Sequence, residues 1–418
     1  MSENSWVDKL VADCSHVETP VSWVWWSAVS AISAAAGNNY VLKTLKGDLI
    51  YRPNLYVMLL GDSGLGKGFP INRAKLLVQK ANITRVIAGR SSIQAIVKEL
   101  STAKSSQNGK PPITDSRGFI VNGELSAAII ADVDSLAILT DLYDGHYNPE
   151  WTNLLKGDGA EKLKNPYITA LFGSSPAHFY DSIPQANIEG GYIGRNLIIY
   201  EEKRSKDVDL LDEVEPEQGD TEKFDDFLVP KYVPHLEKIA SNTGRLIPSD
   251  QARGLFNSWR REWRQKQIPD KTGFLNRVPD HSLKVAMCLC LARSDSIGII
   301  SETDMRTAIE KVSGLVYANK KAAETSNENN LFVLHSRTIL DILIAEESHE
   351  MSRQKMLTRG YGKYNAFEFD AAIENLLEMG WVTRERLVAG KRTDWIIKLA
   401  GEPLANYNEW KKANDRHN

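Results

Sequence analysis

Short apolar runs alternate with helical patterns between residues 50 and 202. Each run is continuous, which is typical of a strand buried on both faces of a parallel sheet. The intervals between the runs, such as Ile71 to Lys80, have helical spacing. Strands and helices in alternation predict an α/β core. The four runs are Leu55–Leu60, Phe119–Val121, Tyr167–Phe172 and Leu197–Tyr200.

A Trp-rich apolar stretch precedes this core. Val21 to Ala36 is 16 residues long and contains four serines. It is too short and too polar to span a bilayer, so we expect a buried helix. Gly37 ends the helix, and the segment from Tyr40 to Arg52 predicts a hairpin with its turn at Gly47.

An acidic segment follows the last apolar run. From Asp207 to Asp226 the chain has ten Asp or Glu residues and one Lys, which predicts a solvated linker. Residues 231–328 then show only helical periodicity and predict an all-helical lid.

The carboxy-terminal part begins after the polar stretch Glu324–Asn330. Helices at Leu331–Ala345 and Ala366–Met379 precede strands at Trp381–Arg386 and Thr393–Lys398, an order that predicts a winged helix. The predicted organisation has six parts. They are an N-terminal helical and hairpin segment at 1–50, a core at 51–205, the acidic linker at 206–230, the lid at 231–328, the winged helix at 331–400 and a tail at 401–418.

Composition narrows the class of protein. The chain has 418 residues, 42% hydrophobic and 25% charged, with a net charge of -3. These values are typical of a globular protein of two or three domains, and any nucleic-acid surface must be local. Three cysteines without metal-ligand spacing predict a reducing, cytoplasmic location. The first eight residues hold Glu3 and Asp8 and no Lys or Arg, so we expect no signal peptide.

The sharpest motif lies between the first strand and the helix that follows it. It fits G-x-x-x-x-G-K. In a strand–loop–helix context, such a loop aims backbone N–H groups and a helix N-terminus at an anion. Lys67 would reach the β- and γ-phosphates of ATP. The residues expected to bind ATP are Gly61, Asp62, Ser63, Gly64, Leu65, Gly66, Lys67 and Gly68.

One position of the motif is unusual. Where a Ser or Thr hydroxyl usually holds Mg²⁺, this chain has Gly68. The ion would then be held by water or by another side chain such as Ser63. The motif therefore supports ATP binding more strongly than ATP hydrolysis.

Polar residues end the second and third strands. Glu124 is placed to polarise an attacking water, and Asn122 stands where an Asp is usual in a phosphate-loop ATPase. Ser174 and Ser175 fit the position of a polar group that senses the γ-phosphate. The alternatives are a strand that ends in a surface Glu and an ordinary turn at the two serines.

The order of these segments resembles AAA+ ATPases, and the Arg195 strand resembles the minichromosome maintenance helicases. A family of phage and prophage ATPases with primase- or helicase-like members is more similar still, and it shares the apolar helix before the nucleotide loop. The resemblance covers about residues 20–325 and implies a homo-oligomeric ring, expected to be a hexamer. It is carried by Leu55–Lys67, Val121–Glu124, Ala170–Pro176 and Gly190–Arg195.

The resemblance also assigns roles to two cations. Arg195 would be an arginine finger that faces outward to the γ-phosphate held by a neighbouring subunit. Gly190, Gly191 and Gly194 would make the segment before it pliable. Lys284 would be a second cationic sensor on the lid. The alternatives are an arginine that caps a strand edge and a lysine on the solvated face of a lid helix.

A basic edge is predicted in the carboxy-terminal unit. Its cations would contact DNA phosphates without reading sequence, and Tyr361 and Tyr364 would stack on exposed bases. The expected recognition helix, Ala366–Met379, is acidic, so binding of another protein is the alternative role of this unit. The expected DNA contacts are Arg353, Lys355, Arg359, Lys363, Arg384, Arg386, Lys391 and Arg392.

These features predict a ring-forming, ATP-dependent helicase or translocase that acts in DNA replication of a phage or mobile element. Its cofactors would be ATP and Mg²⁺, and its partners DNA and other replication proteins, with no membrane. Two alternatives stay open. One is a helicase loader or initiator that uses ATP as a switch, and the other is a DNA-binding scaffold with a degenerate ATPase site, which Gly68 and Asn122 permit.

Overall fold

The computed structural model has two compact units, residues Met1–Ala323 and Glu324–Asn418. It describes residues 5–405 except 45, 47, 90, 103–112, 125–132, 146–148, 155–159, 177, 180–190, 209–223, 267–269, 271, 294–297, 330, 390 and 391. Each unit has its own apolar core, and we describe the two separately.

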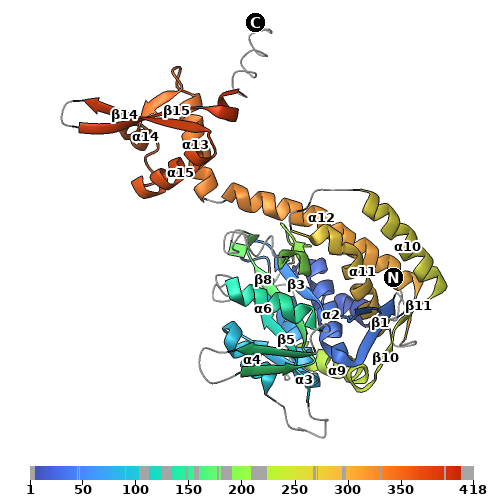
Figure 1. The fold of residues 1–418 in the computed structure, drawn as a ribbon. Helices are drawn as coiled ribbons and strands as arrows, with labels where there is room; N and C mark the ends of the chain where they lie inside the picture. The colour runs from blue at the N-terminus through green and yellow to red at the C-terminus, as the bar shows by residue number, and fades with distance from the viewer. Residues whose placement is uncertain are drawn as a thin grey trace. The chain divides into compact units, whose positions relative to one another are not determined.

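A five-stranded sheet forms the centre of the first unit (Figure 1). Its strand order is β4-β5-β8-β3-β9, and every neighbouring pair is parallel. The predicted α/β class with a parallel sheet is therefore confirmed. β4 was not predicted, because four residues that open on Arg85 give no apolar run. The strands are β3 (Tyr56–Leu60), β4 (Arg85–Ala88), β5 (Arg117–Asn122), β8 (Tyr167–Ser174) and β9 (Asn196–Tyr200).

Helices cover both faces of this sheet, which explains the continuous apolar runs. Val57 and Leu59 of β3 belong to one core cluster with α2 (Val21–Ala36) and α3 (Gly68–Ala81). Met58 and Leu60 belong to a second cluster with α4 (Ile93–Ser101) and α6 (Val133–Tyr143). Burying a Val or Leu side chain on either face contributes about 1.5–3 kcal/mol. A hairpin of β6 (Glu150–Leu154) and β7 (Ala160–Lys164) lies beside α4.

The N-terminal segment packs into the same unit. The helix α2 has the bounds that the apolar pattern predicts, and α1 (Trp6–Asp13) packs against it. The predicted hairpin forms from β1 (Tyr40–Thr44) and β2 (Leu49–Tyr51). β1 also pairs with β10 (Gly244–Arg245), which joins the start of the chain to the region after residue 230.

Residues 231–328 are not all helical, and the acidic linker is shorter than predicted. The linker ends before α9, since Leu228 is already fully buried. Two-residue strands interrupt the helices, and a strand so short shows no alternation from which to predict it. The elements are α9 (Phe224–Ser241), β10, β11 (Ile247–Pro248), α10 (Asp250–Gln265), α11 (Phe274–Ala292), β12 (Ile299–Ile300) and α12 (Glu302–Asn329).

The two compact units divide at Glu324, where the polar stretch begins, and α12 continues through this stretch to Asn329. Only two of its residues, Glu324 and Glu328, are strong helix formers, so the sequence does not predict that the helix extends through it. The region predicted as a lid packs on the rest of the first unit through α11, which contacts α2. No helix in the described ranges is both long enough and apolar enough to cross a membrane.

The second unit contains the predicted helices and hairpin, together with one further strand, β13, and one further helix, α14. Its antiparallel sheet has the order β13-β15-β14. Met356, Phe369 and Ile397 lie in its apolar core. The elements are α13 (Leu331–Ile344), β13 (Glu350–Ser352), α14 (Arg353–Arg359), α15 (Ala366–Glu378), β14 (Val382–Ala389) and β15 (Arg392–Leu399).

Candidate functional site

The glycine-rich motif forms a loop between a buried strand and a helix. β3 ends at Leu60 and α3 begins at Gly68, so Gly61–Lys67 lie at the carboxyl edge of the sheet. Gly64 and Gly66 have φ angles of 90° and 85°, which residues other than glycine rarely adopt. The N-terminus of α3 follows directly, which is the position that anion sites use, although the Phe69 N–H donates to the Gly66 carbonyl at 3.1 Å and Pro70 has no N–H.

Three neighbouring residues pack closely against this loop. A Cβ at Gly61 would lie 2.6 Å from the Glu201 carbonyl oxygen and 2.8 Å from the Trp23 ring. A Cβ at Gly66 would lie 2.4 Å from the Thr19 hydroxyl, which donates a hydrogen bond of 3.0 Å to the Gly66 carbonyl. By contrast, a Cβ at Gly68 would have only one neighbour within 4 Å, 3.9 Å away. Glycine is therefore a steric requirement at 61 and 66 but not at 68.

Lys67 turns back over its own loop. Its ammonium donates to the carbonyl oxygens of Gly61 at 2.5 Å and Asp62 at 2.9 Å. Partial burial lowers the pKa of Lys67, while the negative charges of Asp62 and Glu124 raise it. The Lys67 ammonium is thus a half-buried cation whose hydrogen-bond acceptors are neutral backbone oxygens.

The remaining predicted residues line up along the same edge. β8 lies between β3 and β5, with Leu60 opposite Ser174 and Asn122 opposite Phe172. The amide N–H of Gly61 donates to the Ser174 carbonyl at 3.3 Å. The structure therefore brings the loop, Ser174 and the end of β5 to one edge, as their positions at strand ends predict.

Side chains at this edge make short-range contacts. The Asn122 side chain accepts from the Glu124 backbone N–H at 3.1 Å and donates to the Gly89 carbonyl at 3.3 Å. Glu124 is exposed. The Ser174 hydroxyl is 3.4 Å from His178 Nδ1, and the Ser175 hydroxyl accepts from the His178 backbone N–H. Ser175 thus caps a local turn, whereas Glu124 is free to act on a ligand.

No preformed metal cluster of three His, Cys, Asp or Glu side chains occurs within the described residues. Mg²⁺ in nucleotide sites takes most of its ligands from phosphates and water, so such a cluster is not required. Glu124 and Asn122 supply oxygens on the side of the loop where the ion would lie. Ser63 is exposed on the loop itself.

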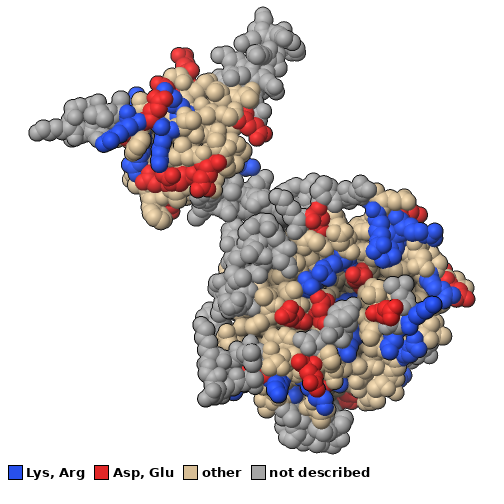
Figure 2. All heavy atoms as spheres, viewed as in Figure 1, with Lys and Arg blue, Asp and Glu red and all other residues tan. Residues whose placement is uncertain are grey.

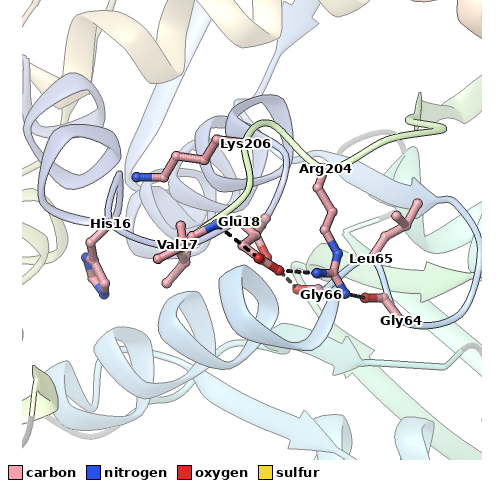
Figure 3. A pocket seen from close by; sticks show the side chains of 10 residues that line it. His16, Val17, Glu18, Gly64, Leu65, Gly66, Arg204 and Lys206 are labelled. Atoms are coloured by element: carbon pink, nitrogen blue, oxygen red, sulfur yellow. Dashed lines mark hydrogen bonds and ion pairs between the residues drawn. The ribbon is translucent and has the colours of Figure 1, made fainter. Parts of the chain in front are cut away.

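A cavity of about 440 Å³ opens beside the loop (Figure 3). One wall is the segment from His16 to Thr19, and the other is the strap from Arg204 to Val208 that follows β9. The Arg204 guanidinium pairs with Glu18 and also donates to the Gly64 carbonyl at 3.3 Å. The strap is therefore fastened both to the N-terminal segment and to the loop.

Arg195 lies at the opposite edge of the sheet, the amino edge, where the parallel strands begin. It precedes β9, whose Asn196 is opposite Tyr56 and whose Tyr200 is opposite Leu60, so the five residues of β3 separate the level of Arg195 from the start of the loop at Gly61. The six residue steps span roughly 20 Å at the usual rise. The expectation that Arg195 faces outward is wrong. Its side chain is 11% exposed and pairs with Asp144 at 2.5 Å.

The glycines near Arg195 also differ from expectation. Gly191 lets the guanidinium donate to its carbonyl at 3.0 Å. Gly194 is packed tightly, since a Cβ there would lie 2.6 Å from the Thr272 carbonyl. Gly190 lies outside the described residues. The segment is locked by contacts, not pliable.

Lys284 is buried beside Arg195 and away from the loop. It donates to the Asn54 side chain at 2.9 Å, and its ammonium lies 3.7 Å from the centre of the Tyr143 ring. Burial lowers its pKa to about 7, although Asp144 and Asp280 act in the opposite direction. Lys284 is neither on a solvated face nor beside Lys67, so it cannot sense a nucleotide at its own chain's loop.

Three of the six described cations of the predicted basic edge are paired with acids. Arg353 pairs with Asp370, Arg359 with Glu346 and Arg384 with Glu374. Two of these acids, Asp370 and Glu374, belong to the recognition helix α15, whose acidity weighed against DNA binding. Lys355, Lys363 and Arg386 are exposed, with no ion pair among the described residues. The side chains of Lys391 and Arg392 lie outside what the structure describes.

The aromatic residues of this unit differ in whether they are accessible to a nucleic acid. Tyr364 is buried and donates to the Met356 carbonyl, so it cannot stack on a base. Tyr361 is 90% exposed, and Phe367, which the sequence analysis missed, is 82% exposed.

Sequence reasoning also missed Thr19, Glu18 and Arg204 beside the loop. Thr19 precedes a proline and a helix and resembles an ordinary cap. No local pattern indicates its hydrogen bond to a residue 47 positions away. Comparison with family models finds no match for this chain, and comparison with curated proteins finds no significant similarity.

Proposed function

We propose that the chain is an AAA+-type ATPase that works as a ring-forming DNA motor, with ATP and Mg²⁺ as cofactors. The observation that carries the proposal is the Lys67 ammonium, held on two loop carbonyls directly before a helix N-terminus. Phosphate oxygens would replace these neutral carbonyls with anionic acceptors, so that an ion pair is added to the hydrogen bonds of the ammonium.

The cavity beside the loop supports a nucleotide rather than a free phosphate. Its volume of about 440 Å³ is within the range of small-ligand pockets, and it opens next to Gly64–Gly66. A nucleoside would lie between the His16–Thr19 segment and the strap, with its phosphates on the loop.

Hydrolysis would depend on Glu124. Its exposed carboxylate lies on the same edge as Lys67 and interacts with it electrostatically. It would orient a water toward the γ-phosphate, and with Asn122 it would meet Mg²⁺ through water. The ion would neutralise charge on the phosphates.

The proposal of a ring depends on Arg195, because this residue is too far from its own chain's loop to complete that site. A neighbouring subunit could receive it only if the pair with Asp144 opened. DNA contacts in the second unit would come from the unpaired Lys355, Lys363 and Arg386, with Tyr361 and Phe367 as stacking groups. Its helices and hairpin support the proposed winged helix.

The test is Glu124→Gln, with Glu310→Gln as a matched control on an exposed face of α12. We expect Glu124→Gln to bind ATP normally and to hydrolyse it about 10²- to 10⁴-fold more slowly, because a positioned base is lost. The control should hydrolyse at the wild-type rate. Undiminished turnover in Glu124→Gln would refute the assignment.

Gly68 and Asn122 favour a second candidate, an ATP-dependent switch such as a loader or a degenerate scaffold. Strand displacement on a forked duplex separates the functions. A motor displaces the strand only with hydrolysable ATP, a loader uses ATP without displacement, and a scaffold neither displaces the strand nor hydrolyses ATP.

A further inference from the structure

The helix α10 presents a basic surface in the first unit. Within Asp250–Gln265, and at the residue that follows, it has five cations and only two acids, Asp250 and Glu262. All of these cations are exposed except Arg260, which is half-buried. This contrasts with the chain as a whole, whose net charge is -3. The cations are Arg253, Arg260, Arg261, Arg264 and Lys266.

The apolar side of α10 is already used. Phe256 is buried, Trp259 and Trp263 pack against the core of the unit, and the ring centres of the two tryptophans are 5.6 Å apart. The Trp263 indole donates to the Leu275 carbonyl at 3.0 Å. Because these rings are held in the protein, α10 has no apolar face to insert into a lipid surface, as an interfacial membrane helix needs.

The arginines are largely free of acidic partners. Arg253 pairs with Asp250, and Arg261 donates its Nε–H to the Asn257 carbonyl. Within the described residues, Arg260, Arg261 and Arg264 form no ion pair. Their guanidinium groups thus keep the two-pronged N–H donors that match a phosphate.

Helix geometry arranges these groups in a line. Residues 253, 260 and 264 fall within an arc of about 40° at 100° per residue, and they span about 17 Å of helix. Figure 2 shows Lys and Arg side chains gathered over this helix. A row of outward cations fits the repeated phosphates of a nucleic-acid backbone.

We propose that α10 is a DNA-binding surface that contacts phosphates without reading sequence. The inference rests on the proposed function only in taking DNA as the partner. It places a DNA contact in the ATPase unit itself, at Arg260, Arg261 and Arg264, in addition to the contacts proposed for the second unit.

The experiment measures affinity for a fluorescent 30-nucleotide DNA, single- and double-stranded, by anisotropy over a range of salt concentrations. The variant is Arg260→Ala/Arg261→Ala/Arg264→Ala. The control is Arg353→Ala/Arg359→Ala/Arg384→Ala, which removes the same charge from paired arginines. Far-UV circular dichroism and nucleotide binding check that both variants fold.

Each phosphate contact contributes about 0.7–0.9 to the slope of log affinity against log salt. We expect the α10 variant to lose about 2 from this slope, with an affinity loss on the order of tenfold or more at low salt. The control should keep most of the slope.

An unchanged slope in the α10 variant would overturn the inference while leaving a DNA-binding wild type, and thus the proposed function, intact. Wild-type protein that binds neither DNA would refute the proposed DNA partner as well. An unchanged DNA slope together with lost binding of polyglutamate would overturn the inference in favour of an acidic protein partner.

Discussion

The two edges of the central sheet use cations in opposite ways. At the carboxyl edge, Lys67 lies half-buried on a loop with neutral carbonyls as partners, and Glu124 is exposed. At the amino edge, Arg195 and Lys284 are buried with dedicated partners, Asp144 and Asn54. A ligand can compete for Lys67, because its present partners are neutral backbone oxygens. To bind Arg195 or Lys284, a ligand would first have to break their contacts within the protein. A cation's availability depends on its partners, which the sequence does not show.

The polar network at the amino edge goes beyond these pairs. The His281 side chain contacts the Gly194 carbonyl at 2.9 Å through Nε2, and burial lowers its pKa to about 3. Nε2 must therefore donate to the carbonyl, and Nδ1 accepts from the Tyr143 hydroxyl at 3.3 Å. This edge joins α11, α6 and the Arg195 segment, so it holds the unit together.

The largest effect is expected from Arg195→Ala, which tests whether the cation at the amino edge has a structural role. Removing the guanidinium leaves Asp144 without its partner. We expect the free energy of unfolding to fall by about 3 kcal/mol, at the low end for a buried pair because Asp144 is 31% exposed. Thermal unfolding should then occur roughly 5 to 10 °C lower. Arg306→Ala, which breaks an exposed pair on α12, should change stability by less than about 1 kcal/mol.

A fall in Arg195→Ala no larger than in this control would contradict a structural role at the amino edge. The proposed role of Arg195 at the nucleotide site of a neighbouring subunit is measured separately. Arg195→Ala mixed with Lys67→Ala should recover part of the ATP hydrolysis that each lacks alone. Mixed oligomers seen by native mass without recovered activity would argue against a shared site.

A smaller effect, on pH dependence, sharpens the contrast. The pKa of Lys284 is about 7 in the folded chain and about 10.4 when unfolded. Between these values the unfolded state binds more protons, so this group makes stability rise as pH increases from 7 to 10. Below pH 7 its unfavourable contribution is fully present. The charged and titratable groups around it are Asp144, Asp280, Arg277, Arg195, His281 and Tyr143.

Lys284→Met removes the charge at similar length. We expect urea unfolding at pH 7, 8, 9 and 10 to show a flatter dependence of stability on pH than in wild type. Lys311→Met, at an exposed position, serves as the control and should keep the wild-type slope. Equal slopes in Lys284→Met and wild type would show that the buried ammonium does not titrate in this range.

Sequence reasoning succeeded where the signal is local. The apolar runs define four of the five central strands, and the bounds of α2 follow from its composition, because burial on both faces leaves a continuous hydrophobic pattern. Gly61–Gly68 could be placed between strand and helix for the same reason.

It failed where the partner is distant. Asp144 is 51 positions before Arg195, and Asn54 is 230 positions before Lys284, so neither pairing leaves a local pattern. Counting cations likewise located a basic edge at 353–363, where acids pair with Arg353 and Arg359, and overlooked α10. The charge count is readable from sequence, but the pairing is a property of the fold.

The central claim is that a nucleotide binds at the carboxyl edge through Lys67. Its most direct measurement is the equilibrium affinity for ATP, by fluorescence titration, of the wild type, Lys67→Ala and Lys80→Ala. Lys80 is exposed at the last turn of α3, so it controls for lost charge on the same helix. A hydrogen bond to a charged group contributes about 1.5–3 kcal/mol, so we expect Lys67→Ala alone to weaken binding by about 10- to 100-fold. Wild-type affinity in Lys67→Ala, or an equal loss in both variants, would contradict the account.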